Sequence, residues 1–243
     1  MSSRRLPVAV LAAADDRSGG ALEVAATAVD GLLEVTDDPA LLEEAVGVLL
    51  AGQPAMAPIW HLAVAARGPD PPSALAGLRR HLHTDADAAV TTATAWLREQ
   101  QATPASVATV SHSSLVQRVL AALAHEGPPS SVGSSAPRWG SVAEPGTASA
   151  RVSTTPTLGV VGADAVGPQG LLNAAGTREL TGRVPTLVVA TAVKLVPAEV
   201  FERLGGPGFE VVPLEALAAV VIGPEVLSPA EAGRRAAQLG TDR

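Results

Sequence analysis

One segment, residues 157–194, constrains the fold of this chain more than any other. An apolar run there ends in Gly162-Ala163-Asp164, and a glycine-bearing turn leads into a predicted helix around Asn173, Gly176 and Thr177. A second apolar run, VPTLVVA, follows. This order predicts a strand, a turn, a helix and a second strand. Ligands of open α/β sheets bind at the carboxyl ends of the strands, and Asp164 stands at such an end.

Composition limits the functions open to the chain. Its 243 residues are 47% hydrophobic and 17% charged, which supports one large folded domain or two small ones. The net charge of -7 argues against a general nucleic-acid-binding surface. The absence of cysteine excludes disulfides, thiolate metal sites and a cysteine nucleophile.

The N-terminus resembles a secretion signal only superficially. Its apolar run from Leu6 to Ala14 is short, and acidic residues follow where a cleavage site is expected. No run approaches the roughly 20 apolar residues of a membrane span. A cytoplasmic protein is therefore expected.

The pattern divides the chain into a helical part, residues 1–103, and an α/β part, residues 104–243. Apolar side chains recur at helical spacing over residues 20–100, and Trp96 is expected inside the core. The α/β part opens with a β-type run at 106–110 and an amphipathic helix at 115–124. In the stretch 124–156, 16 of 33 residues are Ser, Gly or Pro, which predicts a long loop.

Several helix starts are predicted from capping residues. Asp16 and Ser18 are available to cap the helix that begins near residue 20. Asp38 followed by Pro39, and Ser228 followed by Pro229, have the order typical of an N-cap and a first helical residue.

Asp164 and Lys194 each end an apolar run, and each has two interpretations. Asp164 fits a general acid/base or an acceptor for a sugar hydroxyl, or else a turn aspartate that bonds backbone amides. Lys194 fits either a phosphate contact or a surface lysine. The sequence pattern leaves both pairs of alternatives open.

The polar turns give weaker signals. Ser111-His112-Ser113 follows a strand, but adjacent residues rarely aim at each other and no Gly-x-Ser-x-Gly elbow is present, so a helix cap or a phosphate-binding turn is favoured over a nucleophile. Gly167, Gly170 and Gly176 resemble a phosphate-cradling loop without matching the dinucleotide or Walker patterns.

No metal or cofactor is predicted. Four of the histidines lack the spacing of a metal site and are interpreted as solvated helix residues. They are His61, His81, His83 and His125.

Taken together, the motifs resemble a known family. The runs VGADAV, AGTREL and VPTLVVATAVKL are similar to the C-terminal half of the initiation factor 2B alpha/beta/delta family, which also holds methylthioribose-1-phosphate and ribose-1,5-bisphosphate isomerases. Further elements resemble the family in the same order: residues 16–21, residues 53–63, VATVSHSSLVQRVL and FEVVPLEALAAVVIGPEVLSP. The resemblance covers most of the chain and leaves 124–156 unmatched.

This resemblance implies a fold and a place for the site. It implies an N-terminal helical domain, a Rossmann-like parallel-sheet α/β domain of the NagB/RpiA/CoA-transferase type, and a homodimer. In the family's isomerases, a site between the domains uses a cysteine and the aspartate of a G-A-D motif to convert an aldose phosphate into a ketose phosphate. Asp164 matches that aspartate, whereas Ser111 stands at the cysteine position.

The chain departs from the isomerases at this site. A serine hydroxyl is far harder to ionise than a thiol, whose reference pKa is roughly 8.5. Gly19-Gly20-Ala21 replaces their R-G-A phosphate motif, and Asn173-Ala174 replaces their asparagine–lysine pair. Relatives also carry a phosphate loop where this chain has 124–156.

These departures favour a non-catalytic, regulatory initiation-factor-2B-like protein that binds a phosphorylated sugar or nucleotide. The alternative is an aldose–ketose isomerase with an altered acid/base pair, in which Asp164 is catalytic. The expected partners are a phosphorylated small molecule and a second copy of the chain, without membrane or direct nucleic-acid binding. The predicted ligand-binding residues are Ser111, His112, Ser113, Gly162, Asp164, Asn173, Gly176, Thr177 and Lys194.

Overall fold

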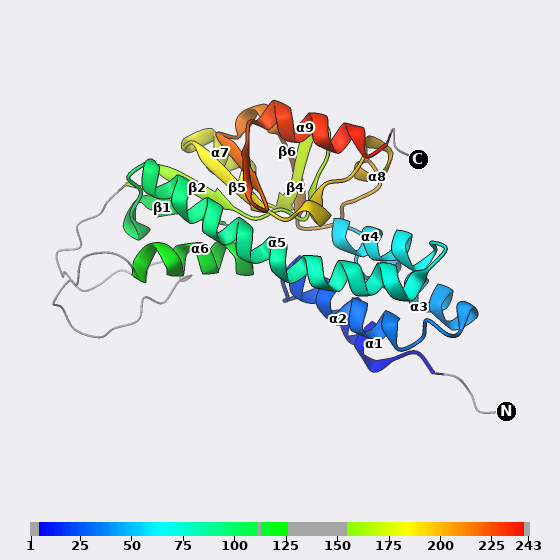
Figure 1. Ribbon diagram of the computed structural model, residues 1–243. Coiled ribbons are helices and arrows are strands. Elements are labelled where there is room, and N and C mark those ends of the chain that lie inside the picture. Colours follow the sequence, from blue (N-terminus) through cyan, green and yellow to red (C-terminus); the bar gives the residue numbers. More distant parts are fainter. Residues whose placement is uncertain (1–4, 111–112, 126–154, 241–243) are drawn as a thin grey trace, which may run out of the picture.

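The computed structural model describes residues 5–110, 113–125 and 155–240. Helices form its N-terminal part, and a mainly parallel sheet forms its C-terminal part (Figure 1). The N-terminal helices are α1 (Val8–Asp15), α2 (Ala21–Leu33), α3 (Pro39–Gly52), α4 (Ala57–Ala66) and α5 (Pro71–Glu99). The predicted fold class, a helical part followed by a Rossmann-like α/β part, is confirmed.

Aspartate and proline set the start of α3 as predicted. The Asp38 carboxylate accepts a hydrogen bond from the Leu41 amide at 3.3 Å, and Pro39 is the first helical residue. Proline suits this position because its missing amide hydrogen has no partner in a first helical turn. Asp70 caps α5 in the same way.

The start of α2 differs from the prediction, and the proposed Asp16 and Ser18 caps are wrong. The N-cap of α2 is Gly20, and no side chain bonds to it there. Asp16 instead accepts hydrogen bonds from the amides of Ser18 at 2.8 Å and Gly19 at 2.7 Å. Because these amides lie before the helix, the Asp16 side chain closes the turn between α1 and α2.

The main sheet has five strands, and four of them are parallel. In spatial order they are β1 (Val107–Ala108), β2 (Leu158–Val161), β5 (Thr186–Ala190), β7 (Ala219–Ile222) and β8 (Glu225–Leu227). Only β8 runs antiparallel to its neighbour. Strands β2, β5 and β7 are buried along their whole length, as in parallel sheets that helices cover on both faces.

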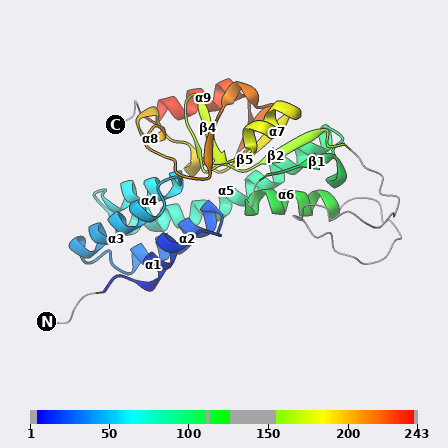
Figure 2. The ribbon, with the colours of Figure 1, turned by 180° about the vertical axis from the view of Figure 1, so that it is seen from behind.

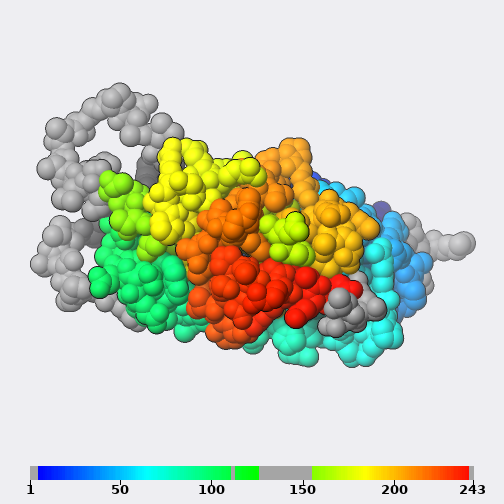
Figure 3. Space-filling view, turned by 90° about the horizontal axis from the view of Figure 1, so that it is seen from above, coloured from blue at the N-terminus to red at the C-terminus, as the bar shows by residue number. Residues whose placement is uncertain are grey.

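Helices cover the two faces of this sheet. Helices α5 and α6 (Ser114–His125) lie on one face, and α7 (Thr177–Arg183) and α9 (Pro229–Gln238) lie on the other (Figures 1 and 2). Side chains alternate between the faces: Leu187 packs toward α5 and α6, and Val188 toward α7 and α9. Figure 3 shows α7 (yellow) and α9 (red) over the outer face. As predicted, Ser228 caps α9.

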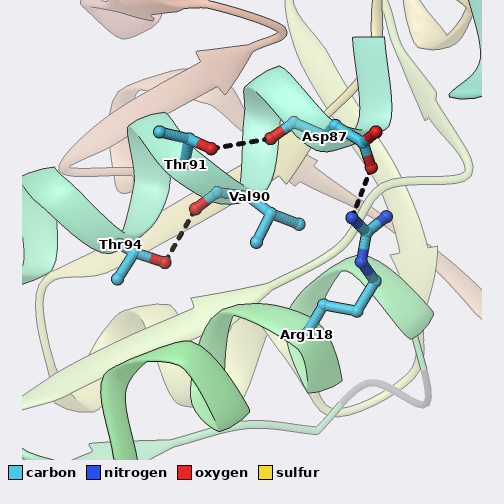
Figure 4. A network of polar contacts seen from close by, with 5 residues as sticks. All are labelled: Asp87, Val90, Thr91, Thr94 and Arg118. Carbon is cyan, nitrogen blue, oxygen red and sulfur yellow. Dashed lines mark hydrogen bonds and ion pairs between the residues drawn. The ribbon is translucent and has the colours of Figure 1, made fainter. Parts of the chain in front are cut away.

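Helix α5 is long enough to belong to both parts of the molecule. Leu75 lies in the core of the helical part, whereas Leu97 lies in the core under the sheet. Trp96, expected inside, is half-buried against that second core. Asp87 of α5 pairs with Arg118 of α6 at 2.5 Å (Figure 4). Both side chains are exposed, so the pair adds little stability and packing holds these helices together.

A second, antiparallel sheet corrects the predicted order of elements. It consists of β3 (Ala165–Val166), β4 (Gly170–Ala174) and β6 (Phe209–Pro213), with β4 in the centre. Asn173, predicted in a helix, lies in β4, and the helix begins only at Thr177. The backbone of β4 pairs with β3 on one side and with β6 on the other. The distant strand β6 thus holds this stretch extended.

Short elements connect the rest. They are η1 (Pro104–Ser106), η2 (Ala192–Lys194), α8 (Ala198–Phe201) and η3 (Leu214–Ala216). Of the predicted loop at 124–156, the first two residues end α6 and 155–156 have no regular structure. Residues 126–154 lie outside the described part of the chain.

Candidate functional site

Two ionisable residues lie where the neighbouring strands β2 and β5 end. Asp164 follows β2 and Lys194 follows β5, and these strands pair in parallel. Parallel neighbours end at the same edge of a sheet, so both residues line one cavity there, with a volume of about 530 Å³. Ser113, which follows the end of β1, lines it too.

The helical part supplies the opposite wall of this cavity. The α1–α2 turn, the first turn of α2 and the α3–α4 connection contribute the polar and apolar groups used below. They are Asp16, Arg17, Gly20, Glu23 and Gln53. The cavity therefore lies between the helical part and the carboxyl edge of the sheet.

The backbone of Asp164 is fixed between these two parts. Its amide donates to the Leu172 carbonyl at 2.9 Å, and its carbonyl accepts from the Ala57 amide, at the start of α4, at 3.0 Å. Among the described residues its carboxylate has no hydrogen-bond or ion-pair partner. Burial raises the pKa of this carboxyl, and the charge of Lys194 partly opposes the shift. A ligand in the cavity would therefore meet a carboxyl group whose pKa is raised by burial and which has no hydrogen-bond or ion-pair partner among the described residues.

Lys194 is the only lysine of the chain, and it is buried. Its side chain is 3% exposed, and no hydrogen bond or ion pair to it occurs in the described ranges. Burial lowers the pKa of its ammonium to about 8, although the Asp164 and Glu23 carboxylates act to raise it. Because Lys194 is buried, it is not a surface lysine, which was one of the two interpretations of the sequence. Burying a charge without a partner is unfavourable, so its position has a cost in stability.

Two of the remaining predicted residues, Asn173 and Thr177, are buried and bonded to each other. The Asn173 side-chain amide donates to the Thr177 hydroxyl at 3.1 Å, and that hydroxyl donates to the Ala174 carbonyl at 2.7 Å. Asn173 lines the cavity, and one of the two hydrogens of its side-chain amide is used in the bond to Thr177. Gly176 is the N-cap of α7 and has a φ of 98°, a conformation that favours glycine.

The other predicted residues are not at the cavity wall or cannot be placed. Gly162 is buried and does not line the cavity. Ser111 and His112 lie outside the described residues. The structure thus brings Ser113, Asp164, Asn173 and Lys194 together at one cavity.

Carboxylates contribute most of the charge on the helical wall. Glu23 Oε2 lies 2.5 Å from the position that a Cβ on Gly20 would occupy, so this carboxylate folds back over the N-cap of α2. Hydrogen bonds from the Gly19 and Ser18 amides hold the pKa of Asp16 below its usual value. Arg17 directs its guanidinium to the Ala14 carbonyl, at 2.7 Å.

Comparison with solved structures identifies the fold. The sequence itself matches no family model and no curated protein. The chain superposes on the translation initiation factor eIF-2B of Pyrococcus horikoshii OT3 with a TM-score of 0.60 and 15% identity, over 91% of this chain and 96% of that one. It superposes on a chain of the tetrameric eIF2B-beta2-delta2 complex of C. thermophilum with a TM-score of 0.61 and 14% identity, over 96% and 92%.

A third structure agrees with these two. For eIF2B beta of Chaetomium thermophilum the TM-score is 0.57 and the identity 12%, over 95% of this chain and 90% of that one. This chain has the eIF2B fold. The fold that the sequence resemblance implied is therefore confirmed over nearly the whole chain.

Within this eIF2B fold, Gln53 is a site residue that the sequence analysis did not include. It is 6% exposed, and its side-chain nitrogen lies 2.7 Å from the Ala13 carbonyl and 2.7 Å from the Asp16 carbonyl. One amide thus holds the end of α1 and the α1–α2 turn against α3. The motif QPAMAP contained it, but nothing local showed that its partners lie nearly 40 residues earlier.

We predict that Gln53→Met lowers the free energy of unfolding by about 2 kcal/mol. Methionine keeps the length of the side chain but removes the donor, which leaves buried carbonyl oxygens without a partner. Chemical denaturation measures the change. Gln100→Met, at an exposed helix end, is the control and should stay within about 0.5 kcal/mol of the unmodified protein. Equal effects of the two substitutions would contradict the role of Gln53.

Two interpretations of the sequence are wrong within this eIF2B fold. Gly167 and Gly170 do not line the cavity: a Cβ on Gly167 would lie 2.4 Å from Cγ of Phe201, so these glycines let the β3–β4 turn pack on that ring. His61 is not a solvated helix residue. Its Nε2 lies 2.8 Å from the Leu195 carbonyl, next to Lys194, and joins α4 to the sheet edge.

The described residues contain no group of three or more His, Asp or Glu side chains placed to hold a metal ion. In the same ranges, no helix has both the length and the apolar character needed to cross a bilayer.

Proposed function

We propose that this chain is an initiation-factor-2B-like protein that binds a phosphorylated sugar or nucleotide in the cavity at the sheet edge, in a regulatory and non-catalytic role. The observation that carries the proposal is the buried ammonium of Lys194, which faces a cavity of about 530 Å³ without an ion-pair partner among the described residues. Cavities of this size are typical of small-molecule sites.

Lys194 explains why the ligand is an anion. Burial disfavours its charge in the free protein, and a phosphate group in the cavity would supply the missing counter-charge. The ligand's hydroxyl groups would find acceptors in the Asp164, Asp16 and Glu23 carboxylates. The combination of two cationic side chains, Lys194 and Arg17, with several carboxylates fits a polyol phosphate better than inorganic phosphate alone.

The non-catalytic role is supported by the chain's composition. The thiol that the related isomerases use is missing, since the chain has no cysteine. A serine at that position cannot exchange a proton near neutral pH without a strong base beside it.

The binding test is calorimetric titration with inorganic phosphate, ribose 5-phosphate and a nucleoside monophosphate. We expect a sugar phosphate or nucleotide to bind, and Lys194→Met to weaken that binding at least tenfold. Affinity should fall above pH 8, by up to about tenfold per pH unit, because Lys194 is then uncharged in the free protein and has to take up a proton when the anion binds. Unchanged affinity in Lys194→Met would refute the assignment of the cavity.

We predict that Glu23→Gln tightens binding of the same ligand about threefold to tenfold. Its carboxylate lies at the N-cap of α2 and acts on Lys194, so it repels an incoming phosphate and competes for the same positive charge. Glu44→Gln, which removes an equal charge from an exposed position of α3, is the matched control. Tightening by both substitutions alike would show only a general effect of net charge.

The second candidate is an aldose–ketose isomerase with an altered acid/base pair. One observation favours it: Asp164 has a raised pKa and Lys194 a lowered one, and such shifts of neighbouring groups toward neutrality are found in acid/base sites. Isomerisation of ribose-1,5-bisphosphate or methylthioribose-1-phosphate, with solvent proton exchange, tests it. Turnover that disappears in Asp164→Asn would support the enzyme and reject the non-catalytic proposal.

The homodimer is part of the same proposal. Its support is the resemblance to the initiation factor 2B family alone, and sedimentation or light scattering of the purified chain measures it directly.

A further inference from the structure

Lys194 differs chemically from any other group of the chain. It is the only side-chain amine in 243 residues, and it is buried in the wall of the cavity rather than exposed on the surface. Within the described ranges its nitrogen neither donates a hydrogen bond nor forms an ion pair. Arginine, which supplies the other 16 basic residues of the chain, stays protonated in proteins, whereas a buried lysine can lose its proton and act as a nucleophile.

We propose that Lys194 captures carbonyl groups: its Nζ condenses with the aldehyde or keto group of an open-chain phosphorylated sugar held in the cavity, forming an imine. This inference rests on the proposed function, since it takes the same cavity as the ligand site. It adds to that function that the ligand reacts in its open-chain carbonyl form and that it forms a reversible covalent bond with Nζ.

The neighbouring groups suit this reaction. Asp164 ends the strand next to that of Lys194 and lines the same cavity, and its carboxyl is not bound to other described residues. Glu23, from α2, is the other carboxylate whose charge acts on the amine. Asp16 and Arg17 complete the ionisable groups of the described wall, and both are engaged with backbone groups of the α1–α2 turn.

The reaction is balanced without any further reactant. The lone pair of Nζ attacks the carbonyl carbon, the carbonyl π pair moves to oxygen, and one of the two protons on the nitrogen passes to that oxygen to give a neutral carbinolamine. The Asp164 carboxyl, whose pKa burial raises, then gives a proton to the departing hydroxyl, which leaves as water, and takes back the second proton that the nitrogen loses. One amine and one carbonyl yield one imine and one water, and nothing is oxidised or reduced.

The free-base form that this attack needs is populated at neutral pH. With a pKa of about 8, roughly a tenth of Lys194 is uncharged at pH 7. An ordinary lysine, with a pKa of roughly 10.4, has less than about one amine in a thousand uncharged at that pH. Amines that are desolvated in this way are known nucleophiles toward carbonyl substrates.

Reductive trapping tests the inference. The full chain is treated with glycolaldehyde phosphate and cyanoborohydride, and the adduct is located by intact-mass and peptide analysis. The chain offers only Lys194 and the N-terminal α-amine, so the α-amine is an internal reference. We expect labelling at Lys194 at least tenfold faster than at the α-amine, and suppression of this labelling by excess inorganic phosphate or ribose 5-phosphate.

Variants and pH separate capture from simple binding. Lys194→Arg should lose the adduct, and Asp164→Asn should form it at least tenfold more slowly, while Glu44→Gln should match the unmodified protein. The trapping rate should rise from pH 6.5 to 8.5, the range in which affinity for a non-carbonyl phosphate starts to fall. The opposite pH dependences of the trapping rate and of phosphate affinity can be measured on the unmodified protein, so this test remains even if Lys194→Arg folds poorly.

The results distinguish the inference from the proposed function. Labelling confined to the α-amine, in a protein whose melting temperature rises with ribose 5-phosphate, overturns the imine and keeps the binding site. Labelling of Lys194 that phosphates do not suppress, or that unphosphorylated glycolaldehyde achieves equally fast, also overturns the inference. A protein that no phosphate ligand stabilises, and whose Lys194 is not labelled, refutes both.

Discussion

Raising the pH from 8 to 10.5 is expected to stabilise the folded protein by about 3 kcal/mol. The pKa of Lys194 is about 8 in the folded chain and returns to its ordinary value of 10.5 on unfolding. Between these values the unfolded state binds a proton that the folded state has released, so stability increases with pH. A difference of roughly 2.5 pKa units corresponds to about 3 kcal/mol.

The composition makes it simple to assign a change of stability at alkaline pH to one residue. The chain has no tyrosine, no cysteine and no second lysine, so Lys194 is the only side chain that titrates between about pH 8.5 and 11. Urea denaturation at half-unit pH intervals measures the effect. Lys194→Met should show no such rise, and at pH 7 it should be more stable than the unmodified protein by about 3 kcal/mol, because it removes a buried charge.

The effects of Lys194→Met on ligand binding and on stability are linked, so one variant tests both. A variant that binds ligand more weakly but folds more stably is the signature of a residue kept for function at the expense of stability. If the unmodified protein and Lys194→Met instead lost stability to the same extent above pH 8, the pKa of Lys194 would not be lowered in the folded state, and the prediction would be wrong.

The same glycine-to-alanine change, made twice in helix α3, is expected to have opposite effects that differ by about 3 kcal/mol. A Cβ on Gly52 would lie 2.5 Å from the carbonyl oxygen of Ala14 and 2.8 Å from its Cα. These are backbone atoms of α1 and cannot rotate away, so Gly52→Ala should destabilise the fold by about 2 kcal/mol. Gly47 has nothing within 4 Å of its Cβ position and is exposed. Gly47→Ala should stabilise it by about 1 kcal/mol.

The two substitutions, Gly52→Ala and Gly47→Ala, should also differ in their effect on ligand binding. Gly52 lines the cavity and precedes Gln53, whose amide holds the α1–α2 turn, so moving α1 in Gly52→Ala should also weaken ligand binding. Gly47→Ala should leave binding unchanged. Thermal denaturation and calorimetric titration of the two variants measure both effects, and destabilisation by Gly47→Ala would contradict the packing described here.

Local patterns predicted those parts of the fold whose hydrogen bonds are local. The helical region, the Asp38 and Ser228 caps and the buried strands β2 and β5 were all evident from spacing and capping residues. The stretch around Asn173 was assigned wrongly because its partner strand, β6, lies more than 30 residues further along the chain. The resemblance of Gly167 and Gly170 to an anion loop was weak, and the sequence could not show their role because Phe201, against which they pack, is also distant.

The site was predicted in part for the same reason. Asp164 and Lys194 follow recognisable strands, and the rule that parallel strands end at one edge was enough to bring them together. Glu23 and Gln53 come from the helical part, and their approach to the sheet depends on how α2 and α3 pack. No pattern within either segment contains that information.

The sequence by itself determined that this chain has buried parallel strands with one carboxylate and its one lysine at their ends, and that it has no thiol for catalysis. Only the tertiary structure decided that Lys194 is buried and that Glu23 and Gln53 stand opposite it. The physical reason is that strand formation and capping depend on near neighbours. Desolvation, which sets the charge of Lys194, depends on every segment that excludes water from it.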